Sequence, residues 1–258
     1  MTADYSTVTE LPGEDVTQEQ IERMARRYYW ASEYCCDKDV LEVACGAGQG
    51  LGYLALVAKS LRAGDITPSL VVRAQARYGE RIRIEEIDAL QLPFPDGSLD
   101  VVILFEAIYY LPLAEQFVGE CRRVLRRGGY VLLATANKDL FDFNPSPYSH
   151  HYYGVVELRE LFGACGFTCE FLGDTSIDTI SWRQKLLRPV KKIIVDLGLM
   201  PRSMAGKKLL KRLVFGKLVP MPAEIKENTA PRIPPVEIPS DRPDTSHKVI
   251  YLAARHSG

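Results

Sequence analysis

The sequence lacks most features that would place it outside the cytoplasm or in a membrane. Its first twenty residues carry acidic and polar side chains without an apolar core, so no signal peptide is expected. No run of about 18 uncharged apolar residues occurs, and no membrane-spanning helix is therefore predicted. The six cysteines form neither a CxxC pair nor a zinc-ligand spacing. We therefore expect reduced thiols, no metal site and a cytoplasmic protein.

What the chain does have is an alternation of short apolar runs with amphipathic segments. At 258 residues and 47% hydrophobic composition, it is long enough for one large α/β domain. The pattern predicts a parallel sheet with helices on both faces and a ligand site at the carboxyl ends of the strands. The predicted strands span residues 39–45, 61–65, 81–88, 99–107, 130–136, 167–173 and 248–254. The predicted helices span residues 17–34, 51–61, 69–78, 113–127 and 155–165.

Residues 175–245 interrupt this alternation. The formal net charge of the whole chain is only −1, yet residues 183–217 contain eleven Lys or Arg and one Asp. Apolar residues recur there at helical spacing, which predicts two amphipathic helices with basic faces, followed by a proline-rich surface loop. Three roles stay open for this basic segment: a solvated lid, contact with an anionic membrane surface, or recognition of an anionic acceptor. Nucleic acid is not expected, because only one aromatic residue lies among the basic ones.

The stretch VLEVACGAGQG, residues 40–50, joins a predicted buried strand to a cluster of glycines. A nucleoside triphosphate loop is excluded because no Gly-Lys-Ser/Thr follows. A dinucleotide loop fits poorly, since Leu51 stands where the third glycine of GxGxxG belongs. Because the GxGxxG pattern is partly matched, a nicotinamide-dependent enzyme stays open as an alternative. Neither phosphate-binding pattern is complete.

The pattern ExxCGxGxG in this stretch resembles motif I of the class I S-adenosylmethionine-dependent methyltransferases. Further segments resemble the same family in order: GDITPS, LPFPDGSLDVVILFEAIYYL, RRVLRRGGYVLLAT and ELRELFGACGF. Together they extend over residues 40–170. The resemblance implies a Rossmann-like sheet of seven strands, mostly parallel, with the last strand antiparallel. Residues 248–254 would be that strand, 175–245 an insertion before it, and 1–258 one domain.

The resemblance implies S-adenosylmethionine as cofactor. Asp65 would accept the ribose hydroxyls, Ile66 would pack on the adenine, and Asp88 would meet its amino group. Ala44 departs from the family pattern, and we predict that its φ is negative, so that its methyl group is tolerated. The expected cofactor-binding residues are Tyr28, Glu42, Ala44, Gly46, Gly48, Gln49, Asp65, Ile66, Asp88, Ala89 and Phe105.

Methyl transfer to a hydroxyl group benefits from a general base. Two of the four histidines, His150 and His151, lie in one loop after the fifth predicted strand, and neutral histidine is a suitable base near pH 7. Glu106, at the end of the fourth strand, is a third candidate. We treat His151, His150 and Glu106 as candidate catalytic residues, with solvated surface histidines as the alternative.

The sequence thus predicts methyl transfer from S-adenosylmethionine to a small-molecule acceptor. O-methylation of a saccharide or lipid-linked glycan precursor is the leading hypothesis, and the acceptor is expected to be anionic or lipid-linked. A quinone or natural-product acceptor is the alternative within the class. A nicotinamide-dependent oxidoreductase and a silent cofactor-binding regulator are the alternatives outside it. The pattern leaves the oligomeric state open.

Overall fold

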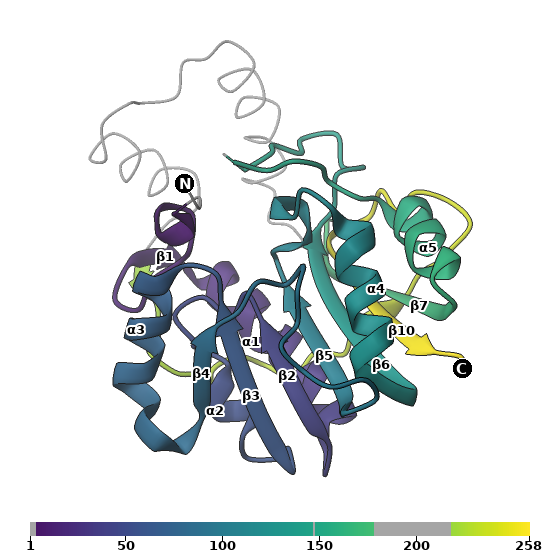
Figure 1. The fold of residues 1–258 in the computed structure, drawn as a ribbon. Coiled ribbons are helices and arrows are strands. Elements are labelled where there is room, and N and C mark those ends of the chain that lie inside the picture. The colour runs from purple at the N-terminus through teal and green to yellow at the C-terminus, as the bar shows by residue number, and fades with distance from the viewer. Residues whose placement is uncertain (1–3, 147, 178–217) are drawn as a thin grey trace.

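The computed structural model describes residues 4–146, 148–177 and 218–258 (Figure 1). The helices and strands follow one another largely as predicted. In chain order they are η1 (Tyr5–Thr7), β1 (Asp15–Thr17), α1 (Gln18–Cys35), β2 (Asp39–Val43), α2 (Leu51–Leu54), β3 (Ser60–Asp65), α3 (Pro68–Tyr78), η2 (Gly79–Arg81), β4 (Arg83–Glu86), β5 (Leu99–Phe105), η3 (Ile108–Tyr110), α4 (Ala114–Val124), β6 (Leu125–Ala136), α5 (Val155–Ala164), β7 (Phe167–Ser176), β8 (Leu218–Pro220), β9 (Val236–Glu237) and β10 (His247–His256).

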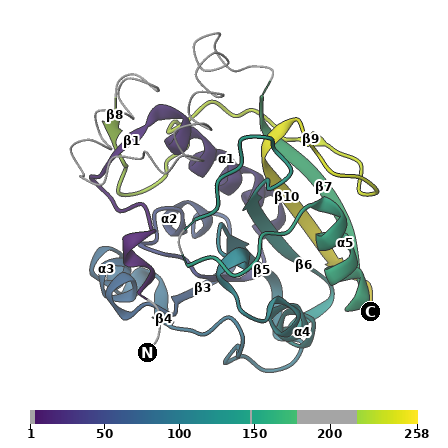
Figure 2. The ribbon, with the colours of Figure 1, turned by 90° about the horizontal axis from the view of Figure 1, so that it is seen from above.

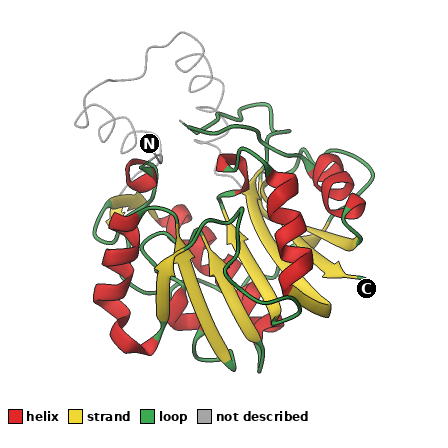
Figure 3. Ribbon diagram, viewed as in Figure 1, coloured by secondary structure: helices red, strands yellow, loops and turns green. Residues whose placement is uncertain are grey.

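The main sheet has the order β4-β3-β2-β5-β6-β10-β7-β9 within the described part of the chain. The first five strands run parallel, and β10 lies antiparallel between β6 and β7. The predicted seven-stranded arrangement with an antiparallel last strand is confirmed, and the two-residue strand β9 extends it at one edge. The parallel strands are shown as arrows in Figure 3.

Side chains alternate between the two faces of the sheet because successive residues of a strand point in opposite directions. Leu41 and Val43 of β2 pack in the core that contains Phe117 of α4 and Phe162 of α5. Val40, by contrast, packs with the buried face of α1. The view in Figure 2 shows α1 and α4 on opposite sides of the sheet. This alternation directs Glu42 toward α1, which sets up one wall of the site.

Helix α1 begins where the sequence predicts. Thr17 is its N-cap and forms a reciprocal capping box with Gln20, whose backbone N–H donates to the Thr17 hydroxyl at 3.2 Å. Its buried aromatic residues pack on the sheet: the Trp30 ring stacks on Tyr251 of β10 with centroids 4.7 Å apart. The helix is therefore held both by its cap and by its apolar face.

Two predicted helix ends are wrong. The helix expected over 51–61 ends at Leu54, because the next residues are tied to the turn before β2. Asp37 N–H donates to the Val57 carbonyl at 3.0 Å, and Lys59 N–H donates to the Lys38 carbonyl at 3.0 Å. The glycine pair expected to close the helix over 113–127 lies inside β6 instead, since that strand already pairs with β5 at Leu125. In both cases tertiary hydrogen bonds override local helix propensity.

The described part of the predicted insertion packs against the core. Strand β8 pairs antiparallel with β1 in a separate two-stranded sheet, and Met221 and Ile225 are buried. The two basic helices predicted for 183–217 lie outside the described residues. Among the helices that the structure describes, none has the length and apolar character needed to cross a membrane.

Candidate functional site

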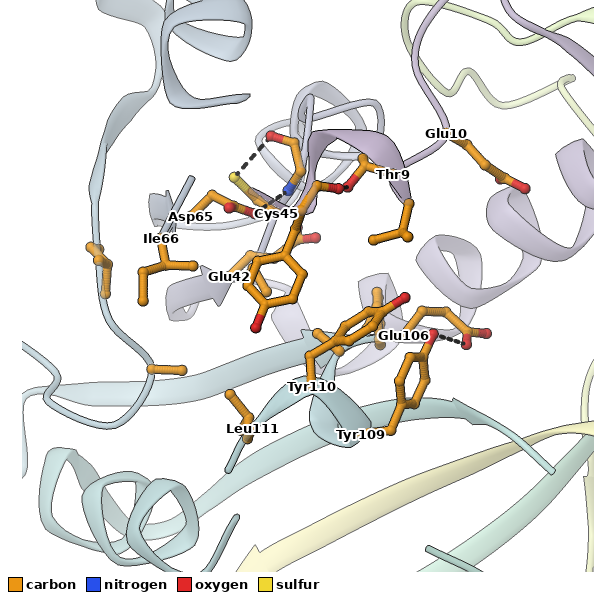
Figure 4. A pocket seen from close by; sticks show the side chains of 18 of the residues that line it. Thr9, Glu10, Glu42, Cys45, Asp65, Ile66, Glu106, Tyr109, Tyr110 and Leu111 are labelled. Atoms are coloured by element: carbon orange, nitrogen blue, oxygen red, sulfur yellow. Dashed lines mark hydrogen bonds between the residues drawn. The ribbon is translucent and has the colours of Figure 1, made fainter. Parts of the chain in front are cut away.

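A cavity of about 590 Å³ opens above the carboxyl ends of the central strands. Its walls come from the N-terminal segment, from α1, from the glycine loop after β2 and from the ends of β3, β4 and β5. Figure 4 shows Asp65 and Ile66 on one side of this space and Glu106 and Tyr109 on the other. The site thus lies where parallel sheets of this kind hold their ligands.

The glycine loop turns through three left-handed residues at alternate positions. The φ angles are +53° at Ala44, +58° at Gly46 and +78° at Gly48. The predicted negative φ of Ala44 is therefore wrong: the turn out of β2 needs the left-handed region at this position as well. The left-handed backbone costs about 1 kcal/mol for an alanine. The Ala44 methyl group packs against the core beside β2, which offsets part of that cost.

Asp65 ends β3 and fixes the loop from the side. Its two carboxylate oxygens accept hydrogen bonds from the backbone N–H groups of Gly46 and Thr67, each at 2.9 Å. The side chain is buried, and burial raises the pKa of the carboxyl group while these N–H groups lower it. A carboxylate has about four acceptor sites, so Asp65 can accept a ligand hydroxyl in addition to these two N–H groups.

Glu42 is the most deeply buried carboxyl group in the cavity wall, at 1% exposure. Its Oε1 accepts a hydrogen bond from the Tyr28 hydroxyl at 2.6 Å. Its Oε2 is buried with no hydrogen-bond partner among the described residues. Burial raises the pKa of Glu42 to about 7, against the opposing effects of Tyr28 and Arg27. The unpartnered oxygen is a ready acceptor for a cationic or N–H-bearing ligand group.

The ends of β3 and β4 form the apolar side of the cavity. Ile66, Ile87 and Ala89 line it together with Asp88. One Asp88 oxygen accepts the backbone N–H of Leu90 at 2.8 Å, which fixes the carboxylate at the end of the strand. An apolar slot with a carboxylate at its rim suits a heterocyclic base that bears an amino group.

The end of β5 carries the polar groups of the opposite side. Glu106, in the left-handed region at φ +51°, lies 3.7 Å from guanidinium nitrogens of both Arg23 and Arg27. The Tyr109 hydroxyl donates to Glu106 at 3.3 Å. Burial, and then the charge of Glu106, raise the pKa of this phenol well above its usual range. Tyr109 is therefore a neutral donor at physiological pH.

The two candidate histidines are placed differently. His150 lines the cavity, and its backbone N–H donates to the Tyr109 carbonyl at 2.7 Å. The ring of His151 lies outside the cavity lining, with Nε2 at 3.4 Å from Glu157 and a side chain 54% exposed. The geometry thus favours His150 over His151 as the group that reaches a bound ligand.

Most of the predicted site residues lie on one cavity, but two do not. Gly48 and His151 are absent from its lining, although Gly48 shapes the loop. The predicted residues that do line it are Tyr28, Glu42, Ala44, Gly46, Gln49, Asp65, Ile66, Asp88, Ala89, Phe105, Glu106 and His150.

Sequence reasoning missed the N-terminal part of the wall. Tyr5 packs on Tyr110 with ring centroids 5.1 Å apart, and the Gln49 side chain donates to the Glu10 carbonyl at 2.6 Å. No local pattern marks residues 5–10, because their role comes only from folding back over the glycine loop. Arg23 and Arg27 were also missed, although their spacing of four on α1 places them on one helix face.

Comparison with known proteins agrees with this geometry. Residues 41–133 match the family model of a methyltransferase domain. Over 147 residues the chain is 37% identical to a probable S-adenosylmethionine-dependent methyltransferase of Mycolicibacterium smegmatis, covering 55% of this chain and 57% of that protein. It is 35% identical over 102 residues to a fatty-acid O-methyltransferase of the same organism, covering 38% and 37%. The YcgJ protein of Bacillus subtilis has the same fold, with a TM-score of 0.59 at 17% identity over 90% of this chain and 98% of that one.

The matched residues 41–133 contain the glycine loop and the strands from β3 to β5, so the part of the chain that is similar to a methyltransferase domain lines the cavity. This part of the chain is similar to S-adenosylmethionine-dependent methyltransferases, in agreement with the resemblance seen in the sequence. The chain spans less than two thirds of the length of the curated relatives described above.

The residues present fit the cofactor that this family implies. The orphaned Glu42 oxygen, the left-handed glycine loop and the fixed carboxylates Asp65 and Asp88 match its cationic, amino-acid and adenosyl parts in turn.

Proposed function

We propose that the protein transfers a methyl group from S-adenosylmethionine to an oxygen atom of a small acceptor carried on a lipid or a saccharide. The observation that carries the proposal is the cavity that joins Asp65 and Asp88 to Glu106, Tyr109 and His150 across the glycine loop. One end suits an adenosyl group, and the other offers a proton acceptor and donor. The similarity to a fatty-acid O-methyltransferase supports an oxygen acceptor.

When bound, the cofactor supplies an activated methyl group on a sulfonium. The protein itself contributes by positioning the cofactor and the acceptor. Asp65 and the glycine loop fix the adenosyl end, while Glu42 provides negative charge near the cationic end. His150 is placed to take the proton of an acceptor hydroxyl at a ring nitrogen. Tyr5 lines the cavity and packs on Tyr110, and we expect the segment around it to limit the access of water to the reacting groups.

The test has two arms. Calorimetry should show binding of S-adenosylhomocysteine and none of NADPH. Incubation with methyl-labelled S-adenosylmethionine and lipid or glycan extracts should then transfer label into a product that alkaline hydrolysis or glycan analysis identifies as an ester or ether. Binding of NADPH alone would reject the proposal. Binding of S-adenosylhomocysteine without any transfer of label would indicate a catalytically silent regulator that binds the cofactor.

Contact with a membrane surface through residues 183–217 is a separate proposal that rests on the sequence. Eleven basic residues and apolar repeats at helical spacing support it. Co-sedimentation with phosphatidylglycerol liposomes should exceed that with phosphatidylcholine liposomes and fall as salt is raised. Equal sedimentation with both would contradict it.

A further inference from the structure

Two arginines on one face of α1 line the cavity at the end of β5. The nearest guanidinium nitrogens of Arg23 and Arg27 both lie 3.7 Å from the same oxygen of Glu106, which is too long for a good hydrogen bond. The Nε atoms of both are buried without a partner, and within residues 4–146, 148–177 and 218–258 neither guanidinium donates a hydrogen bond. Among the described residues, Glu106 therefore leaves the hydrogen-bonding capacity of both arginines unused.

Arg27 is held in place by its neighbours. Its guanidinium lies 5.7 Å from the centroid of the Phe105 ring and 5.8 Å from that of the Tyr28 ring. Its side chain is 16% exposed and that of Arg23 is 27% exposed, so Arg23 stands nearer the solvent. A planar fork held between rings is preorganised for an oxyanion, which it can bind through two parallel hydrogen bonds.

The net charge of the cavity does not by itself favour an anionic acceptor. The arginines are balanced by Glu106 and, more distantly, by Glu10. S-adenosylmethionine carries a sulfonium, an ammonium and one carboxylate, so it adds one positive charge. Glu42, Asp65 and Asp88 also line the cavity and offset the positive charge of the cofactor, so what attracts an anion is the local charge of the two guanidinium groups.

The position of the pair separates it from the adenosyl side. Asp65 and Asp88 end β3 and β4, whereas the arginines stand over β5, beyond the glycine loop of β2 in the strand order. Figure 4 shows Glu106 and Tyr109 across the cavity from Asp65 and Ile66. This is the side on which an acceptor must approach the methyl group if Glu106, Tyr109 and His150 face it.

We propose that Arg23 and Arg27 form an oxyanion subsite that binds a carboxylate or phosphate group of the acceptor. This inference rests on the proposed function and narrows it, because it makes the acceptor an acidic molecule rather than a neutral sugar or alcohol. Glu106 then acts as the counter-ion that both arginines share.

The test titrates octanoate, octyl phosphate and the neutral control octanol into protein saturated with S-adenosylhomocysteine. We expect one of the two anions to bind at least tenfold more tightly than octanol. Arg23→Gln and Arg27→Gln should each weaken the binding of that anion by roughly tenfold, which is the effect of losing a charged hydrogen bond. Arg73→Gln, at an exposed position of α3, is the matched control and should change nothing. Thermal melts would verify that every variant is folded.

Two results would overturn the inference. Equal binding of octanol and both anions would leave the arginines as partners of Glu106 only. Alternatively, Arg23→Gln or Arg27→Gln could weaken the binding of S-adenosylhomocysteine tenfold and leave the binding of 5′-methylthioadenosine, which lacks the amino-acid part, unchanged. The arginines would then hold the cofactor's own carboxylate. Failure of the proposed function is seen separately, as no binding of S-adenosylhomocysteine to the unaltered protein.

Discussion

The two halves of the cavity are built in different ways. The half where we propose that the cofactor binds, the cofactor half, is formed by residues 44–49, 65–66 and 87–90. It uses short loops whose backbone N–H groups hold the carboxylates of Asp65 and Asp88. The half where we propose that the acceptor binds, the acceptor half, is formed by Arg23 and Arg27 of α1, by residues 105–112 at the end of β5 and after it, and by His150. Its polar groups contact one another loosely, at 3.3 to 3.7 Å. A half fixed by its own backbone suits an invariant ligand, and a half fixed by side chains suits one that differs among relatives.

Glu42 lies between the two halves of the cavity, and its substitution should have the largest effect, which is on the pH dependence of the free energy of unfolding. Its folded-state pKa of about 7 is above the usual 4.5, so its contribution to stability is present below pH 4.5 and lost as pH rises through about 7. This loss is of order 3 kcal/mol. Urea unfolding at pH 5 and pH 8 should show that Glu42→Gln removes the pH dependence. Glu80→Gln, at an exposed site, is the control and should keep it. An unchanged pH dependence in Glu42→Gln would show that other groups cause it.

A change in the acceptor half should alter turnover and spare the cofactor. His150→Ala is expected to lower kcat by about a hundredfold, the usual contribution of a general base, with unchanged affinity for S-adenosylhomocysteine. His151→Ala should have the smaller effect, since its ring lies beside Glu157. Steady-state kinetics and calorimetry on both variants would measure this. A larger loss in His151→Ala would reverse the assignment.

A substitution in the cofactor half should weaken the binding of S-adenosylhomocysteine and leave turnover nearly unchanged. Asp65→Ala is expected to weaken S-adenosylhomocysteine by about 2 kcal/mol, because it leaves ligand hydroxyls and two loop N–H groups unpaired. Calorimetry measures the affinity, and kcat at saturating cofactor should change little. Asp65→Asn, which keeps the shape, should fall between. If Asp65→Ala binds normally, the carboxylate does not contact the cofactor.

The smallest effect is expected at Ala44. Ala44→Gly relieves the left-handed strain but loses the packed methyl group, so stability should rise by no more than about 1 kcal/mol. Ala76→Gly, on the exposed side of helix α3, should instead lose about 1 kcal/mol. The midpoints of urea unfolding would compare the two. A loss at Ala44 as large as that at Ala76 would mean that packing outweighs the strain.

The same contrast explains what could be predicted from sequence. The cofactor half lies within continuous motifs, so the amino-acid sequence alone places Asp65, Asp88 and the glycine loop in one site. Arg23 and Glu10 reach the cavity only through the packing of α1 and the return of the N-terminal segment, which no short pattern encodes. Ala44 shows a further limit, since the residue type indicated an ordinary φ that the turn out of β2 did not allow.

The central position of β10 has a consequence for folding. Tyr251 pairs with Ala134 on one side and with Leu172 on the other, so the strand must find two partners that are distant in sequence. Until it arrives, β6 and β7 have no shared neighbour and both present open, apolar edges. Long-range pairing of this kind is slow and leaves intermediates prone to self-association. The rate of refolding, and the concentration at which it succeeds, should therefore be set by the docking of this one strand.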